Sequence, residues 1–222
     1  MISNLPASAP LIALLAVLAG VFAVALPYGT PGGTQQPAME SALASAWGLP
    51  QEPGARSETP AAAAEDVDSL DAIIAALYDV ISGEKIGPDG ENQRDWDRFL
   101  SLFHPELGRL IPLAPDVKDP ANPTWRAIGM SPAGYVERGS SFMGTTAFYE
   151  KEIHRVEEVF GGIAHAWSTY EGRNTRDAEE AFLRGVNSIQ AMYDGERWWL
   201  LVVAWDAERP DQPLPAKYLP KK

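Results

Sequence analysis

Four long stretches with the two-residue period of β-strands, the last of them apolar on both faces, fill the second half of the chain and limit its possible folds most strongly. They cover residues 147–160, 163–173, 182–193 and 197–208. Gly161-Gly162 separates the first two stretches, and Asp194-Gly195-Glu196 separates the last two; short links that contain glycine are typical hairpin turns. Because side chains alternate between the two faces of a strand, this pattern predicts an antiparallel meander of four strands.

Three segments before the meander show helical periodicity instead. Residues 65–83 carry apolar side chains three and four positions apart, and a glycine ends the segment as a stop signal. Residues 94–105 offer Asp95 as an N-cap, and residues 131–144 offer Ser131 followed by proline. Residues 108–113 form a short strand, followed by a proline-rich loop. Helices followed by a meander predict an α+β fold.

The first 66 residues differ from the rest in composition. Residues 11–26 are an uninterrupted apolar run of 16 residues, whereas a membrane-spanning helix needs roughly 20. We therefore predict a signal peptide over residues 1–26, with an uncleaved membrane anchor at residues 11–26 as the alternative. Residues 27–66, rich in Pro, Gly and Ala, form a flexible linker, and residues 67–222 form the folded domain. The protein is expected to be exported, to the periplasm or outside the cell.

Charge and composition exclude several kinds of partner. The formal net charge is −12, which disfavours contact with nucleic acid or with anionic lipid, so a membrane is expected only at an uncleaved N-terminal segment. The chain has no cysteine, which removes disulfides, thiolate nucleophiles and cysteine-based zinc sites. Its three histidines are not spaced as a pair of helical ligands, so no metal site is expected.

Three blocks carry a resemblance to a known family. They are "RDWDRFLSLFHPELGRLIP", "FYEKEIHRVEEVFGGIAHAWSTYEGR" and "RGVNSIQAMYDGERWWLLVVAWDAE", which together span most of residues 67–210. The chain resembles the nuclear transport factor 2-like superfamily, and within it the bacterial SnoaL-like domains. The resemblance implies a cone-shaped, curved antiparallel sheet wrapped around three N-terminal helices, with a cavity inside.

The resemblance also implies several chemistries without choosing among them. The superfamily includes ketosteroid isomerases, scytalone dehydratase, epoxide hydrolases and polyketide cyclases, and many members without an assigned activity. In the isomerases a base carboxylate follows the first strand, but here Pro112 and Leu113 stand there. The histidines of the dehydratase have no convincing match in His154 or His165. Any reaction would be cofactor-independent acid–base chemistry, so no cofactor is expected.

Candidate site residues follow from the faces of the predicted strands. Small residues indicate the face nearest the helices, and this choice places five polar residues inside the cone: Ser168, Tyr170, Arg184, Ser188 and Gln190. Such a set would bind a small hydrophobic or polar ligand, or would form a buried network of its own. His104 is the best candidate for a general acid or base, since histidine titrates near neutral pH. Alternatively, its ring complements the end of a helix.

The opposite face of the sheet is predicted to be rich in aromatic residues. It would carry His165, Trp167, Trp199 and Trp205, a composition typical of interface cores, so a homodimer through this face is a hypothesis. The alternative is that the C-terminal tail covers these rings. Three functions remain open: a domain with a small-molecule pocket and no assigned role, a dehydratase, isomerase or cyclase acting on a hydrophobic substrate, or a tethered protein-binding module.

Overall fold

The computed structural model describes residues 59–87, 91–116, 124–143 and 146–221, without the side chains of residues 139–143. The predicted signal peptide or anchor, residues 1–26, and most of the predicted linker lie outside these residues, so both stay predictions. In the part of the chain that is described, no helix has the length and apolarity needed to span a membrane. The linker's last residues include a short 3-10 helix, η1, at Ala64–Asp66.

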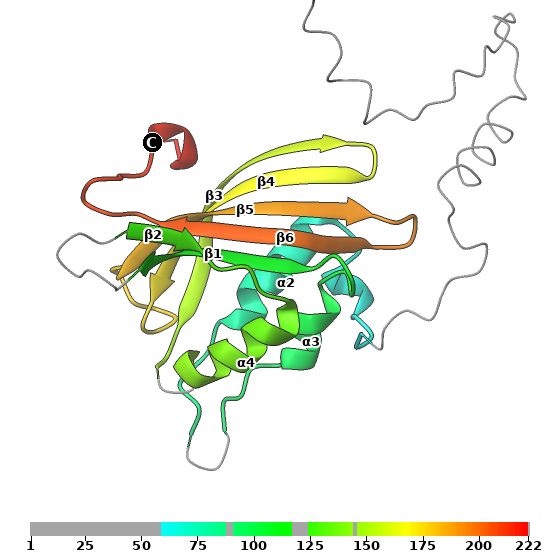
Figure 1. The fold of residues 1–222 in the computed structure, drawn as a ribbon, viewed down its shortest axis with the longest axis horizontal. Helices are drawn as coiled ribbons and strands as arrows, with labels where there is room; N and C mark the ends of the chain where they lie inside the picture. Colours follow the sequence, from blue (N-terminus) through cyan, green and yellow to red (C-terminus); the bar gives the residue numbers. More distant parts are fainter. Residues whose placement is uncertain (1–58, 88–90, 117–123, 144–145, 222) are drawn as a thin grey trace, which may run out of the picture. The chain divides into compact units, whose positions relative to one another are not determined.

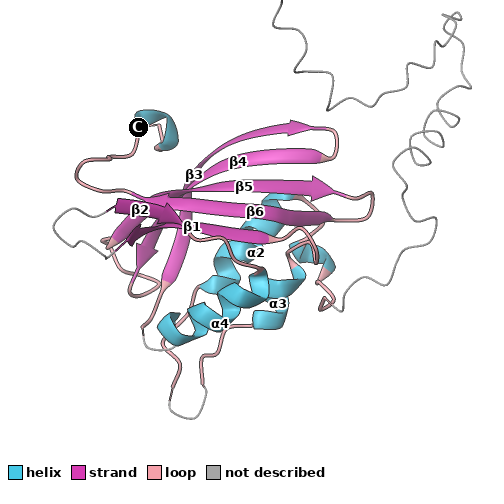
Figure 2. Ribbon diagram, viewed as in Figure 1, coloured by secondary structure: helices cyan, strands magenta, loops and turns pink. Residues whose placement is uncertain are grey.

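Three α-helices precede or interrupt the sheet, and each begins at a polar cap (Figures 1 and 2). Ser69 caps α2, accepting a hydrogen bond from the Ala72 amide at 3.1 Å. Asp95 caps α3, accepting one from the Arg98 amide at 2.9 Å, and Ser131 accepts one from the Gly134 amide at 3.1 Å at the start of α4. The caps predicted at Asp95 and Ser131 are confirmed. The helices are α2 (Leu70–Ile81), α3 (Trp96–Ser101) and α4 (Pro132–Met143).

A curved sheet of six strands covers the helices, in the order β2-β1-β6-β5-β4-β3. The four predicted strands form the antiparallel meander, and β1 pairs with β6 in parallel. The residues predicted as a loop contain one more short strand, β2, which pairs antiparallel with β1. The strands are β1 (Arg109–Asp116), β2 (Thr124–Ala127), β3 (Tyr149–Phe160), β4 (Ile163–Arg173), β5 (Leu183–Tyr193) and β6 (Trp198–Ala207).

The core lies between the helices and the concave face of the sheet (Figure 2). Helix α2 turns one face inward, and the small residues Ala164 and Ala166 of β4 are buried in the same core. The same face of β4 continues through Ser168 and Tyr170, as predicted. The fold is therefore the expected α+β arrangement, with a curved sheet wrapped around three α-helices.

One irregularity in β3 decides which side chains enter the concave side. Between Phe160 and His154 this strand pairs with β4 in a single register, and the register then shifts by one residue between Glu152 and His154. Such a β-bulge turns the side chains beyond it to the other face. As a result Glu152 lies opposite Tyr170, and Glu150 shares this inward face. Unbroken alternation would have turned both glutamates outward.

Candidate functional site

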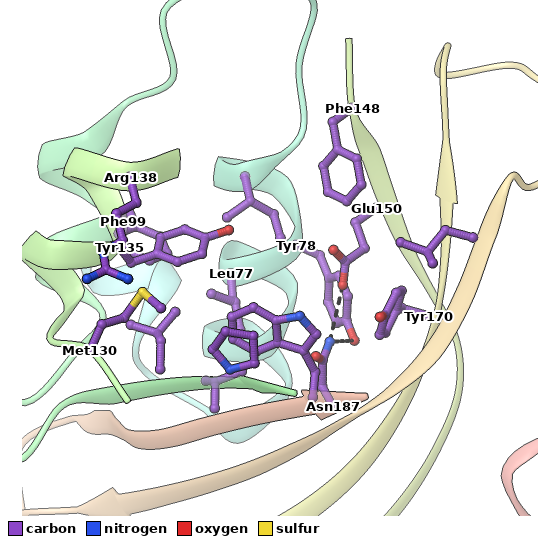
Figure 3. Close-up of a pocket in the computed structure, with 16 residues that line it drawn as sticks. Leu77, Tyr78, Phe99, Met130, Tyr135, Arg138, Phe148, Glu150, Tyr170 and Asn187 are labelled. Atoms are coloured by element: carbon purple, nitrogen blue, oxygen red, sulfur yellow. Dashed lines mark hydrogen bonds between the residues drawn. The ribbon is translucent and has the colours of Figure 1, made fainter. Parts of the chain in front are cut away.

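A cavity of about 330 Å³ lies between the helices and the concave face of the sheet (Figure 3). This volume falls at the lower end of the roughly 300–1,000 Å³ that is usual for ligand pockets. Its walls are largely apolar, and polar groups enter at a few points only. The polar lining residues are Tyr78, Tyr135, Arg138, Glu150, Tyr170 and Asn187; the apolar ones include Leu77, Phe99, Leu110, Met130, Phe148, Leu183, Val203 and Trp205.

Glu150 is held in the cavity wall from two directions. The bulge in β3 turns its side chain inward, and Ser82 at the end of α2 fixes its backbone. The Ser82 hydroxyl accepts a hydrogen bond from the Glu150 amide at 2.9 Å and donates one to the Tyr78 carbonyl at 2.7 Å. Helix α2 and strand β3 are thereby joined beside the carboxyl group.

The surroundings of Glu150 keep its carboxyl group partly protonated at neutral pH. Burial among apolar walls raises the pKa of Glu150 to about 7, and a hydrogen bond from the Asn187 side chain at 3.2 Å opposes this rise. In the described part of the chain no cation pairs with this carboxylate. The residue is partly buried, and it lines the cavity. A carboxyl group in this state can both donate and accept a proton.

A chain of hydrogen bonds connects Glu150 with a second glutamate. The Asn187 amide also donates to the Tyr78 hydroxyl at 2.9 Å, and that hydroxyl lies 2.7 Å from the Ser168 hydroxyl. Ser168 donates in turn to Glu152. Because the Ser168 proton is committed to Glu152, the Tyr78 hydroxyl donates to Ser168. The Tyr78 hydroxyl thus accepts one hydrogen bond and donates another within the protein. Burial raises the pKa of this phenol.

An ion pair anchors the far end of this chain. Arg155 bonds to Glu152 at 2.7 Å and reaches Asp71 on α2 at 2.5 Å. Glu152 is therefore paired with an arginine, whereas Glu150 has no such partner among the described residues. Two carboxyl groups on the same face of one strand consequently differ in their surroundings, one structural and one available to a ligand.

Two phenols of the cavity remain free to meet a ligand. Neither the Tyr135 nor the Tyr170 hydroxyl has a hydrogen-bond partner among the residues that the structure describes. Burial raises the pKa of both phenols, so they stay neutral and keep their protons. Tyr135 is held by stacking on Phe99, with 5.2 Å between ring centroids, and its hydroxyl points into the cavity (Figure 3).

The predicted site residues on β4 and β5 fall into two groups. Tyr170 lines the cavity, and Ser168 lies behind it in the hydrogen-bond chain. The predicted inward face of β5 is wrong: Ser188 bonds to the His165 ring at 3.0 Å on the convex face, Gln190 is exposed, and Arg184 pairs with Glu208 at 2.7 Å. None of these three lines the cavity.

The pairing register between β4 and β5 explains this correction. Ser168 lies opposite Asn187, and Tyr170 lies opposite Gly185, so residues 185, 187 and 189 share the inward face. The charged loop of residues 174–182 gives no sequence signal for this register. The pairing of β5 with β6 places Trp205 opposite Asn187, and Trp205 lines the cavity, which corrects its predicted position on the outer face.

His104 follows α3 and lies outside the cavity wall. Its Nδ1 atom accepts hydrogen bonds from the Glu106 and Leu107 amides, both at 3.3 Å, and its ring lies 5.6 Å from Trp199. The ring thus stabilises the turn after the helix, and Glu150 takes its place as the acid–base candidate. In the described ranges, no group of three or more histidine, aspartate or glutamate side chains could hold a metal ion.

The convex face is partly covered by the C-terminal tail. The Thr169 hydroxyl donates to the Tyr218 carbonyl at 2.6 Å, and the Tyr218 ring lies 5.7 Å from that of Trp167. This contact corresponds to the predicted alternative in which the tail covers the aromatic face. The exposed apolar residues Val159, Phe160 and Ile163 extend beyond it, around the turn between β3 and β4. The homodimer stays a hypothesis.

The residues that sequence reasoning missed are Glu150, Asn187, Tyr135 and Arg138. An asparagine inside a strand is uncommon, and Asn187 was therefore a usable signal. Gly185 was another, because a Cβ there would lie 2.4 Å from the Asp206 carbonyl oxygen and 2.5 Å from the Tyr170 hydroxyl, so only glycine fits between them. The sequence gives no signal for Glu150, because its inward position depends on the bulge in β3.

No protein-family model and no curated protein matches the chain. Among solved structures, it is similar to an uncharacterized protein with a cystatin-like fold from Caulobacter vibrioides, at 15% identity and a TM-score of 0.45, covering 65% of this chain and 90% of the other. It is also similar to an NTF2-like protein of unknown function from Pseudomonas putida, at 12% identity and a TM-score of 0.45, covering 66% and 90%. A similar structure of an NTF2-like protein of unknown function from Silicibacter pomeroyi has 10% identity and a TM-score of 0.40, covering 64% of this chain and 94% of the other.

The descriptions of the last two structures name the family that the sequence resembles. All three are described as uncharacterized or of unknown function. The chemistry of the cavity therefore has to come from the residues of this chain.

Proposed function

We propose that the cavity binds a small, mainly apolar molecule and that Glu150 exchanges a proton with it. The protein would then be a cofactor-independent acid–base enzyme of the isomerase or dehydratase type. The observation that carries this proposal is a glutamate with a pKa of about 7 inside an apolar cavity. Its conjugate base is present at neutral pH, and apolar surroundings make a carboxylate a stronger base than it is in water.

The two free phenols supply the complementary group. As its carboxylate, Glu150 takes a proton from a carbon next to a carbonyl group of the substrate, and the electron pair moves onto the carbonyl oxygen. A hydrogen bond from Tyr135 or Tyr170 stabilises that enolate oxygen, since both phenols stay protonated. In a β,γ-unsaturated substrate Glu150 then returns the proton to the γ-carbon as the double bond moves into conjugation, which is isomerisation. In a β-hydroxy substrate the electron pair instead expels the hydroxyl group as water with the proton from Glu150, which is dehydration.

A test that needs no knowledge of the natural substrate uses 5-nitrobenzisoxazole. A carboxylate base removes its C3 proton, the electrons form a nitrile, and the N–O bond breaks to release a coloured phenolate. The full chain should accelerate this ring opening, and the rate should rise with pH through about 7, where Glu150 loses its proton. Removing a general base typically costs about 10²-fold or more, which is the loss expected for Glu150→Gln.

The control variant is Glu158→Gln, which removes the same charge from an exposed position of the same strand. It should react at the wild-type rate. Equal rates for the wild type and Glu150→Gln across this pH range would contradict the proposal.

A further inference from the structure

The cavity has one acidic and one basic residue in its wall, and they lie on different elements. Of the described residues that line it, Glu150 on β3 is the only acid and Arg138 on α4 is the only lysine or arginine. Figure 3 shows the two side chains on opposite sides of the space, with the Tyr135 ring reaching in between. A ligand that fills the cavity would therefore meet a proton-exchanging group on one side and a fixed positive charge on the other.

Arg138 is placed to receive a ligand group. Its side chain is exposed although it lines the cavity, so it lies at the mouth. None of the residues that the structure describes forms an ion pair or hydrogen bond with its guanidinium group. By contrast, two arginines at the start of α3 are committed: Arg94 donates to three backbone carbonyls, and Arg98 pairs with Asp66 and Asp79.

We propose that Arg138 binds an anionic group of the substrate, which is then a small amphipathic carboxylic acid. The apolar body would fill the cavity up to Glu150, and the carboxylate would stay at the mouth, where it keeps part of its hydration. A guanidinium group matches a carboxylate with two parallel hydrogen bonds. A single cation suits a single negative charge, and the net charge of −12 on the chain would otherwise repel an anion. This inference rests on the proposed function and specifies its substrate class.

The test compares two probes of equal length, octanoate and octan-1-ol. Their binding to the full chain is followed by tryptophan fluorescence at pH 6, since Trp205 lines the cavity and Glu150 is then largely protonated. We expect octanoate to bind more tightly than octan-1-ol. Arg138→Gln should weaken octanoate binding about tenfold, the size expected for a charge-assisted hydrogen bond, and leave octan-1-ol unchanged. Arg138→Lys should retain part of the preference.

Arg126→Gln is the matched control, because it removes one positive charge from an exposed position on β2, away from the cavity. It should leave both affinities unchanged. If octan-1-ol binds but Arg138→Gln leaves the affinity for octanoate unchanged, the inference is wrong, whereas the apolar pocket is supported. If neither probe binds, the inference fails together with the apolar pocket on which the proposed function depends.

Discussion

Replacing Glu150 by glutamine should make the protein more stable at alkaline pH. The folded protein holds a proton on Glu150 up to about pH 7, whereas an ordinary glutamate releases it near 4.5. Between these values the folded state binds more protons than the unfolded state, so this group makes stability fall as the pH rises through the window. Below about pH 4.5 the ionisation of Glu150 does not lower the stability, and above about pH 7 the loss of stability is complete and constant.

The size of the effect follows from the shift. With about 1.36 kcal/mol for each pKa unit, moving from 4.5 to about 7 corresponds to roughly 3 kcal/mol of lost stability. Glutamine has nearly the same shape, cannot ionise, and can still accept the hydrogen bond from Asn187. Glu150→Gln should therefore be more stable than the wild type by roughly 2–3 kcal/mol at pH 8 and equally stable near pH 4.

Urea unfolding of the full chain, followed by tryptophan fluorescence at several pH values, measures this difference. The control is again Glu158→Gln, which should follow the pH dependence of the wild type. The reasoning would be refuted if the stability difference between Glu150→Gln and the wild type were the same at pH 4 and pH 8.

Two further substitutions test the packing that shapes the cavity. Gly185→Ala places a methyl group 2.4 Å from the Asp206 carbonyl oxygen and 2.5 Å from the Tyr170 hydroxyl, and should destabilise the protein by about 1–3 kcal/mol in urea unfolding. Gly129→Ala, where a Cβ meets nothing within 4 Å, is the comparison, and an equal effect of both would argue against the crowding at Gly185. Arg94 donates to three carbonyls at the end of α2, at 3.0–3.1 Å, so Arg94→Gln should lower stability by about 3 kcal/mol. Thermal unfolding of Arg94→Gln is compared with that of the control Arg126→Gln. Similar melting temperatures of the two variants would count against the role of Arg94.

The helices and the meander were predictable because local patterns determine them. Asp95 and Ser131 mark helix starts through their own hydrogen bonds, and the spacing of apolar residues marks the buried helix faces. The inward face of β4 was also predictable, since the small residues Ala164 and Ala166 mark the face that is buried toward the core. Strand β2 was not, because all four of its residues are exposed and its pairing with β1 alone defines it.

The site itself depends on registers that no local pattern determines. Alternation along β3 would turn Glu150 outward, and one inserted residue before His154 turns it inward. The register of β5 against β4 places Asn187, rather than Ser188, in the cavity. A shift of one residue exchanges the two faces of a strand, so a correct list of strands can still give a wrong list of pocket residues.

The central claim is that Glu150 is a proton-exchanging carboxyl group in the cavity. Its most direct test is a pH titration of the full chain labelled with ¹³C at the glutamate side-chain carboxyl carbons, followed by NMR. The Glu150 signal is assigned by its absence in Glu150→Gln. The account predicts a midpoint near pH 7 for this signal. A midpoint near 4.5, the ordinary value for glutamate, would contradict it.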